Sequence, residues 1–248
     1  MKNTFQTLTY STWYEMKKDL TKDICNRDNF PYNKFLFRGH SSEEWGLTAT
    51  LDRRYSGLAL GKRKEKEKFL LENFRDMCIT WEGRGNLSNC DEKQLMSIGQ
   101  HYGLPTRLLD WTYSIYIAAF FAFSDLMSDA SNVAIWVLDK EHEIWNANYG
   151  VTIVNARVEE NDRQKYQYGV FTLNESPCKS IEEYVETCGK QYCVDGALYK
   201  IILPSNERKI VLNDLEMMGL TPYNLYRGIE GCARTTILRE FMQQDTQE

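Results

Sequence analysis

QHYGLPTRLLDWT, residues 100–112, is one of the two most distinctive stretches of the chain. A Gly-Leu-Pro turn at 103–105 stands among His, Tyr, Thr, Arg, Asp and Trp. Gly and Pro fix such a turn, so the polar side chains around it can converge. Asp110 lies between two apolar residues, so we expect it to be partly buried and paired, with Arg107 or Arg38 as the candidates. The residues are compatible with a binding site or with a structural Asp–Arg network.

The segments on either side of this stretch predict a buried helix and a buried strand. Residues 115–123 are apolar and rich in Ala, which favours a closely packed helix. Upstream, FLFRGH at 35–40 predicts a buried strand that delivers Arg38 near its end. The planar fork of Arg38 can hold a phosphate through two bonds, and Gly39 would let a ligand approach the backbone. An ion pair between Arg38 and a carboxylate is the alternative interpretation.

Apolar periodicity and turn residues predict the other elements of an α+β chain. The stretch 139–168 is polar and is expected to be an irregular excursion. No repeat or linker divides the chain, so one domain over 1–248 is expected. Helices are expected over 10–25, 62–81, 91–100, 180–188, 207–218 and 223–242, and strands over 133–138, 169–173 and 197–203, with a weaker strand at 47–51.

The helix expected over 62–81 has an unusual distribution of charge. Lys and Glu alternate over 62–68, which is typical of a solvated helix terminus. Its expected apolar face is made of Leu70, Phe74, Met77, Cys78 and Trp81.

Composition excludes several classes of protein. The chain has 248 residues, 42% of them hydrophobic, and no run of apolar residues long enough to span a membrane. Seven cysteines without a CxxC pair argue against a disulfide framework or a zinc ribbon, and three histidines against a His-rich metal site. A net charge of -5 argues against non-specific binding to nucleic acid, but it is compatible with a local basic cleft made by Arg38, Arg53, Arg54 and Arg107. We therefore expect a cytoplasmic protein that holds no metal and contacts no membrane.

Familiar catalytic motifs are absent from the sequence. It contains no GxGxxG, GxxxxGK[ST], GxSxG or HExxH. A nuclease that uses Asp110 with a metal is disfavoured, because the sequence shows no carboxylate cluster of the kind that hard cations need.

Taken together, the two distinctive stretches resemble the FRG domain, which is named for its first motif. The resemblance rests on FRG at 37–39, QHYGLPTRLLDWT at 100–112 and AAFFAF at 118–123. It continues through VAIWVLD at 133–139, RQKYQYGVF at 163–171 and LYKIILP at 198–204. It implies a motif-bearing core over 35–225 within one FRG-type domain, with an N-terminal helix at 10–25 and a C-terminal helix at 223–242.

The order of motifs also resembles that of the ADP-ribosyltransferases. Their fold carries an Arg or His on a first strand, a Ser/Thr on a second strand that runs into an A-x-x-F-A helix, and a third motif, usually centred on Glu, before a later strand. Arg38 and Thr112 match the first two, and Gln167 stands where the third is expected. The resemblance implies an α+β fold of small, mostly antiparallel sheets with surrounding helices. Glu159 or Glu160 could substitute for Gln167 from the preceding loop, although less well.

This second resemblance implies that the substrate is NAD. Cleavage of its nicotinamide–ribose bond passes through an oxocarbenium-like sugar, which a carboxylate can stabilise. Tyr102 or Trp111 would stack on nicotinamide, and Thr112 or His101 would hold the ribose hydroxyls. The expected catalytic residues are Arg38, Thr112, Gln167 and Asp110, and the expected NAD-binding residues are Arg38, Gly39, His101, Tyr102, Thr106, Arg107 and Trp111.

Two functions follow as hypotheses. The first is an NAD-dependent ADP-ribosyltransferase, a bacterial toxin or anti-phage defence effector that modifies RNA, DNA or protein and is regulated by an antitoxin or similar protein. Because Gln167 cannot take a proton, either Asp110 supplies the charge, or the acceptor is already nucleophilic, or the protein binds without transfer. The last case is the alternative hypothesis, a non-catalytic module that recognises a nucleotide, nucleic acid or protein.

Overall fold

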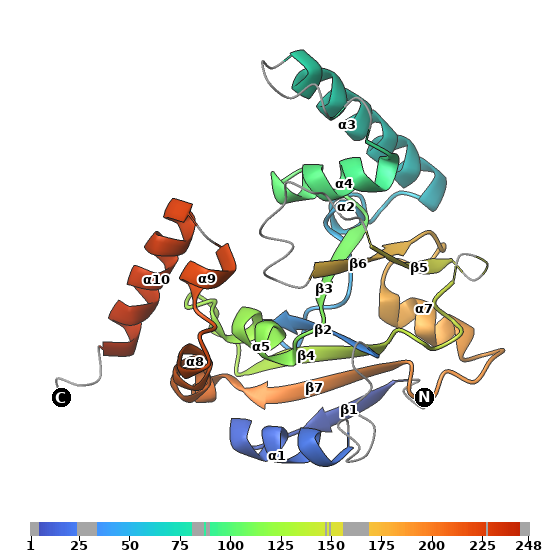
Figure 1. Ribbon diagram of the computed structural model, residues 1–248. Helices are drawn as coiled ribbons and strands as arrows, with labels where there is room; N and C mark the ends of the chain where they lie inside the picture. Colours follow the sequence, from blue (N-terminus) through green and yellow to red (C-terminus); the bar gives the residue numbers. More distant parts are fainter. Residues whose placement is uncertain are drawn as a thin grey trace.

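A computed structural model of the chain describes residues 5–23, 34–80, 87, 90–146, 148, 150–155, 169–226 and 228–243. The described strands form one seven-stranded sheet in the order β1-β7-β4-β2-β3-β6-β5, surrounded by helices (Figure 1). Neighbouring strands are antiparallel, except that β1 is parallel to β7. The strands are β1 (Gln6–Thr9), β2 (Phe35–His40), β3 (Leu108–Thr112), β4 (Asn132–Asp139), β5 (Val151–Val154), β6 (Gly169–Asn174) and β7 (Leu198–Pro204).

The sheet nearly separates into two parts between β2 and β3. These strands share a single residue pair, Phe37 with Thr112, whereas β2 pairs with β4 along its whole length and β3 pairs with β6 likewise. In Figure 1, β3 runs across the direction of β4 and β7. The class is α+β as expected, but the expectation of several small sheets is wrong, because this one pair joins two smaller parts into one sheet.

The helices cover both faces of the sheet, and the sheet divides the main core in two. Side chains of β4 alternate between the two sides: Ile135 and Val137 pack with α1, α5 and α8, while Trp136 and Leu138 pack with α7. The described helices are α1 (Trp13–Asp23), α2 (Thr50–Arg54), α3 (Leu60–Thr80), α4 (Glu92–His101), α5 (Ile115–Phe123), α7 (Ile181–Cys188), α8 (Arg208–Met217), α9 (Pro222–Tyr226) and α10 (Gly228–Gln243). No helix among the described residues is long and apolar enough to cross a membrane.

Strand β2 and helix α5 are in backbone contact at Gly39. A Cβ atom on Gly39 would overlap the carbonyl oxygen of Ala118 and lie 2.7 Å from the nitrogen of Ala122. The two alanines provide the flat helix surface that this approach requires. Gly39 is therefore needed for helix packing, a role that the sequence did not suggest.

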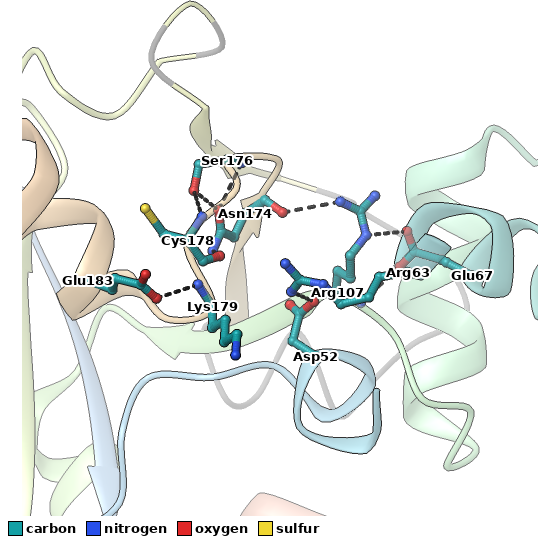
Figure 2. A network of polar contacts seen from close by, with 9 residues as sticks. All are labelled: Asp52, Arg63, Glu67, Arg107, Asn174, Ser176, Cys178, Lys179 and Glu183. Carbon is teal, nitrogen blue, oxygen red and sulfur yellow. Dashed lines mark hydrogen bonds and ion pairs between the residues drawn. The ribbon is translucent and has the colours of Figure 1, made fainter. Parts of the chain in front are cut away.

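Helix α3 is attached to the rest of the protein through buried charges. Its buried positions are Arg63, Glu67 and Leu71, four residues apart on one helical face. Arg63 pairs with Asp52 of α2, and the Glu67 carboxylate accepts bonds from the Arg107 backbone nitrogen at 2.9 Å and from its Nε at 2.6 Å (Figure 2). Arg107 also donates to the carbonyl of Asn174 at the end of β6. The network ties α2 and α3 to the start of β3.

Helix α3 therefore differs from the sequence expectation. Arg63 and Glu67 belong to the Lys/Glu run that was expected to be solvated, yet each is only 2% exposed. Met77, expected on the apolar face, is 72% exposed, and Trp81 lies outside the described residues. Phe74 is confirmed, since it packs against a buried apolar cluster that includes Leu71 and Leu95. The prediction was wrong for the charged positions, because it assumed that the buried face of a helix must be apolar.

Most other predicted elements are confirmed, with four differences. The weak strand at 47–51 is wrong, because Thr50 begins α2, and the irregular stretch 139–168 contains β5. The helix expected over 10–25 begins at Trp13, and the helix expected over 223–242 is α10, preceded by the separate α9. Gly228, at the start of α10, has a φ of +58°, a conformation that glycine adopts without strain.

Replacing Gly39 by Ala should destabilise the fold by about 1–3 kcal/mol or more, because the added methyl meets backbone atoms that cannot turn aside. Gly57→Ala is the matched control, since a Cβ there has no neighbour within 4 Å. Urea unfolding of the two variants checks this. Equal stability would show that β2 and α5 are not in backbone contact.

Replacing Arg107 by Met should cost about 3–5 kcal/mol, because the Glu67 charge is left buried without its partner. The double variant Glu67→Leu, Arg107→Met should be more stable than Arg107→Met alone. The exposed pair Arg234–Glu230 is the control, and Arg234→Met should cost about 1 kcal/mol or less. Additive losses in the double variant would contradict the buried pair.

Candidate functional site

A cleft of about 900 Å³ opens where β2 and β3 part. Residues of both strands line it together with residues of α2, α4 and α5, the start of β6 and the segment 41–48. Six of the sequence-predicted site residues line the cleft: Arg38, Gly39, His101, Asp110, Trp111 and Thr112.

Arg38 is fixed in the cleft by contacts on two of its three guanidinium nitrogens. Its Nη1 donates to the carbonyl of Asp110 at 2.7 Å and lies 3.7 Å from the Asp110 carboxylate, and its Nε donates to His40 Nε2 at 3.0 Å. Within the described part of the chain, Nη2 has no hydrogen-bond partner, and 22% of the side chain is exposed. Arg38 is therefore held in one orientation with donor capacity left for an anion.

His40 acts as a neutral hydrogen-bond acceptor for Arg38. Since Nε2 accepts from Arg38, Nδ1 carries the proton and donates to the carbonyl of Trp45 at 3.1 Å. Burial lowers the pKa of His40 to about 3, and the neighbouring Arg38 charge adds to this effect. A protonated His40 would present a donor to the Arg38 donor, so the contact requires the neutral ring. His40 is not among the site residues predicted from the sequence.

Asp110 ends a chain of hydrogen bonds that begins at buried Thr106. Thr106 donates to Gln100 Oε1, and Gln100 Nε2 donates to the Asp110 carboxylate at 2.8 Å. The Asp110 side chain is 62% exposed, so the expectation that it is partly buried is wrong. Of its two expected partners, Arg38 is confirmed and Arg107 is not.

Thr112 lies where β3 turns into α5. Its Oγ1 accepts from the backbone nitrogen of Ser114, whose own hydroxyl accepts from Ile117 and begins α5. Strand β3 therefore ends at Thr112 and leads through a short turn into the A-x-x-F-A helix α5. Thr112 lies beside Arg38, because it pairs with the preceding residue of β2, Phe37.

Three of the predicted NAD-binding residues do not line the cleft. Tyr102 is exposed at the end of α4, Thr106 is buried beneath Gln100, and Arg107 is bound to Glu67. Trp111 contributes to the cleft lining, but the residue is only 2% exposed and its Nε1 donates to Thr172 Oγ1. Neither Tyr102 nor Trp111 therefore presents a ring face to the cleft.

The cleft also contains residues outside the predicted catalytic and NAD-binding sets. Ser97 and Gln100 lie on α4 at positions i and i+3, with His101 at i+4, so one turn of helix presents three polar groups. This spacing was a signal that could have been read from the sequence. Trp45 is 53% exposed at the cleft and packs edge-on against His40, so it offers the ring surface that Tyr102 and Trp111 do not.

The sequence predicted a third motif at Gln167, with Glu159 or Glu160 as substitutes. Gln167, Glu159 and Glu160 lie outside the described residues, whereas Gly169, at the start of β6, lines the cleft. Among the described residues, Asp110 and Glu44 are the carboxylates that line the cleft. No group of three or more His, Cys, Asp or Glu residues in the described ranges could hold a metal ion.

The low pKa of His40 makes stability depend on pH. The folded value of about 3 lies below the ordinary value of 6.5, so the unfolded chain binds the proton first. The contribution of His40 is present above pH 6.5 and is lost as the pH falls towards 3. Between pH 6 and 4.5, wild type should lose up to about 1.4 kcal/mol per pH unit more than His40→Gln. Parallel unfolding curves for the two proteins would contradict this assignment.

Residues 33–131 match the family model of the FRG domain. Neither the curated proteins nor the solved structures give a match. The matched region includes Arg38, Gly39, His40 and all of 100–112, and it ends before β4. The part of the chain that carries the FRG domain match is thus the part that supplies most of the cleft lining.

Proposed function

We propose that the chain is an NAD-dependent ADP-ribosyltransferase whose active site is the cleft between β2 and β3. The observation that carries the proposal is the position of Arg38, which is held by His40 and Asp110 in a cleft that Thr112 also lines. An Arg on one strand and a Thr on a second strand that leads into an A-x-x-F-A helix correspond to the first two transferase motifs.

In this proposal, Arg38 binds the pyrophosphate of NAD. An Arg side chain that is already oriented loses less conformational entropy on binding, and its fork matches two phosphate oxygens. His40 and the backbone carbonyl of Asp110 hold Arg38 in position for this contact. Thr112 lies beside Arg38 and is suited to hold a ribose hydroxyl.

Trp45 is the proposed stacking residue for nicotinamide or adenine. An exposed indole at the cleft offers a flat apolar face to an aromatic ring. This replaces the roles that the sequence suggested for Tyr102 and Trp111.

Asp110 is the described carboxylate proposed to stabilise the oxocarbenium-like sugar. It lines the cleft, and its carboxylate is held in place by a hydrogen bond from Gln100 and by the nearby Arg38 guanidinium. When the nicotinamide–ribose bond breaks, its electron pair leaves with nicotinamide, and a fixed negative charge lowers the energy of the cation that remains. The acceptor then forms the new bond to ribose and gives up its proton.

The alternative proposal is a module that binds a nucleotide, nucleic acid or protein without transfer. It is favoured by the engagement of Asp110 with Arg38 and Gln100, which reduces the capacity of this carboxylate for chemistry. A shift of the unfolding temperature with ADP-ribose, in the absence of nicotinamide release from NAD, would support the module.

The biological role is proposed by resemblance alone. A toxin or anti-phage defence effector in the cytoplasm would modify an RNA, DNA or protein acceptor, and a regulatory protein such as an antitoxin would restrain it. Incubation with labelled NAD and separated RNA, DNA and protein fractions of a cell extract identifies which acceptor class takes the label.

Arg38→Gln should lower nicotinamide release and label transfer by about tenfold to a hundredfold, because it removes a charge-assisted contact to phosphate. Arg38→Lys should recover only part of the activity, since Lys keeps the charge and loses the fork. Unfolding temperatures of both variants control for folding. Wild type that neither releases nicotinamide nor labels any fraction, or that behaves like Arg38→Gln, would contradict the proposal.

A further inference from the structure

A second guanidinium group, that of Arg53, lines the same cleft. Arg53 Nη1 donates to the carbonyl of Thr48, and Nη2 donates to Thr50 Oγ1 at 3.2 Å. Among the described residues, no carboxylate forms an ion pair with it. Its neighbour Arg54 also carries a charge, but Arg54 lies near the ring of Tyr55 and does not line the cleft. The Arg53 charge is therefore positioned but not neutralised by the described protein.

The orientation of Arg53 is set by the buried network. Asp52, the preceding residue of α2, is 2% exposed and pairs with Arg63 of α3 (Figure 2). The backbone nitrogen of Leu51 donates to the carbonyl of Thr106 at 3.1 Å, which fixes α2 beside the segment that leads into β3. Adjacent side chains of a helix point about 100° apart. Because Asp52 points into the interior, Arg53 points away from it, toward the cleft that it lines.

Arg53 lies close enough to Arg38 to act on it electrostatically. Burial lowers the pKa of Arg38, the Asp110 charge opposes this, and the Arg53 charge adds to the lowering. The same Arg53 charge also contributes to the low pKa of His40, after burial, Arg38 and Lys200. Two like charges that face one cleft repel each other, and a bound anion between them relieves the repulsion.

A buried hydroxyl of α4 also lines the cleft without a partner. Ser97 is 2% exposed, and its Oγ has no hydrogen-bond partner among the described residues. An unsatisfied buried hydroxyl costs about 1–3 kcal/mol unless a ligand or water completes it. Serine hydroxyls commonly donate to phosphate oxygens, so Ser97 adds a neutral donor to the charged one.

We propose that Arg53 and Ser97 form a second anion subsite, and that the cleft takes a diphosphate with one phosphate on Arg38 and the other on this subsite. The inference rests on the proposed function, of which it specifies the phosphate contacts. It predicts that the cleft discriminates between ligands by the number of phosphates, so that ADP-ribose and pyrophosphate bind and AMP and phosphate bind far more weakly.

Isothermal titration of the full chain with pyrophosphate, phosphate, ADP-ribose and AMP tests the proposal. Arg53→Gln should weaken binding of pyrophosphate and ADP-ribose by about tenfold to a hundredfold. Arg54→Gln is the matched control, because it removes the same charge from the next residue of the same helix, and it should change affinity by less than about twofold. Ser97→Ala should lower the affinity for both pyrophosphate and ADP-ribose by about fivefold. Unfolding temperatures show that the variants are folded.

Each outcome separates this inference from the proposed function. Pyrophosphate binding that depends on Arg53 but not on Arg54 supports the subsite, even if NAD does not bind, in which case the proposed function fails. NAD turnover with equal ADP-ribose affinities in Arg53→Gln and Arg54→Gln overturns the subsite and leaves the function standing. Failure of wild type to bind pyrophosphate and ADP-ribose overturns the subsite, and failure to bind or turn over NAD as well overturns both.

Discussion

The buried ion pair between Glu67 and Arg107 joins the helical layer of α2 and α3 to the sheet. The two side chains are 2% and 4% exposed, and the carboxylate accepts bonds from both the backbone and the side chain of Arg107. Separating the two charges would leave each buried without its partner, at a high cost in free energy. The ion pair therefore fixes α2 and α3 against the start of β3. The cleft depends on this attachment, because α2 supplies one of its walls while β2 and β3 supply another.

The cleft itself follows from the way that β2 and β3 meet. A single residue pair joins them, and the backbone contact of Gly39 with α5 holds that helix directly beside the join. Polar side chains from both strands therefore converge on one side: Arg38 and His40 from β2, and Asp110 and Thr112 from β3. Each is oriented by protein contacts, so the site is organised before any ligand arrives, which reduces the entropic cost of binding.

Local signals predicted much of this architecture. The strand that carries Arg38, helix α5 and the capped α4 could be read because apolar runs and caps act over a few residues. Strand β1 was not predicted, since it is a short edge strand with mostly exposed side chains and gives no alternation to read. The pairing of Asp110 with Arg38 was one of two candidates, and the sequence alone could not choose between Arg38 and Arg107.

The remaining errors come from contacts between distant residues. Arg107 was placed in the site because it lies within 100–112, yet its partner Glu67 is forty residues upstream on a helix that was expected to bury only apolar groups. The contributions of Arg53 and Ser97 likewise depend on how α2 and α4 lie against the sheet. Spacing within one helix could have indicated the polar face of α4. The sequence suggested Arg38, Arg53, Arg54 and Arg107 for a basic cleft, but no local pattern shows that Arg38 and Arg53 line it while Arg54 and Arg107 do not.

The position of a bound nucleotide tests the central claim most directly. A crystal structure of the protein with ADP-ribose should show the diphosphate in contact with Arg38 in the cleft between β2 and β3, and a ring stacked on Trp45. ADP-ribose bound at another surface, or a diphosphate that makes no contact with Arg38, would contradict the account.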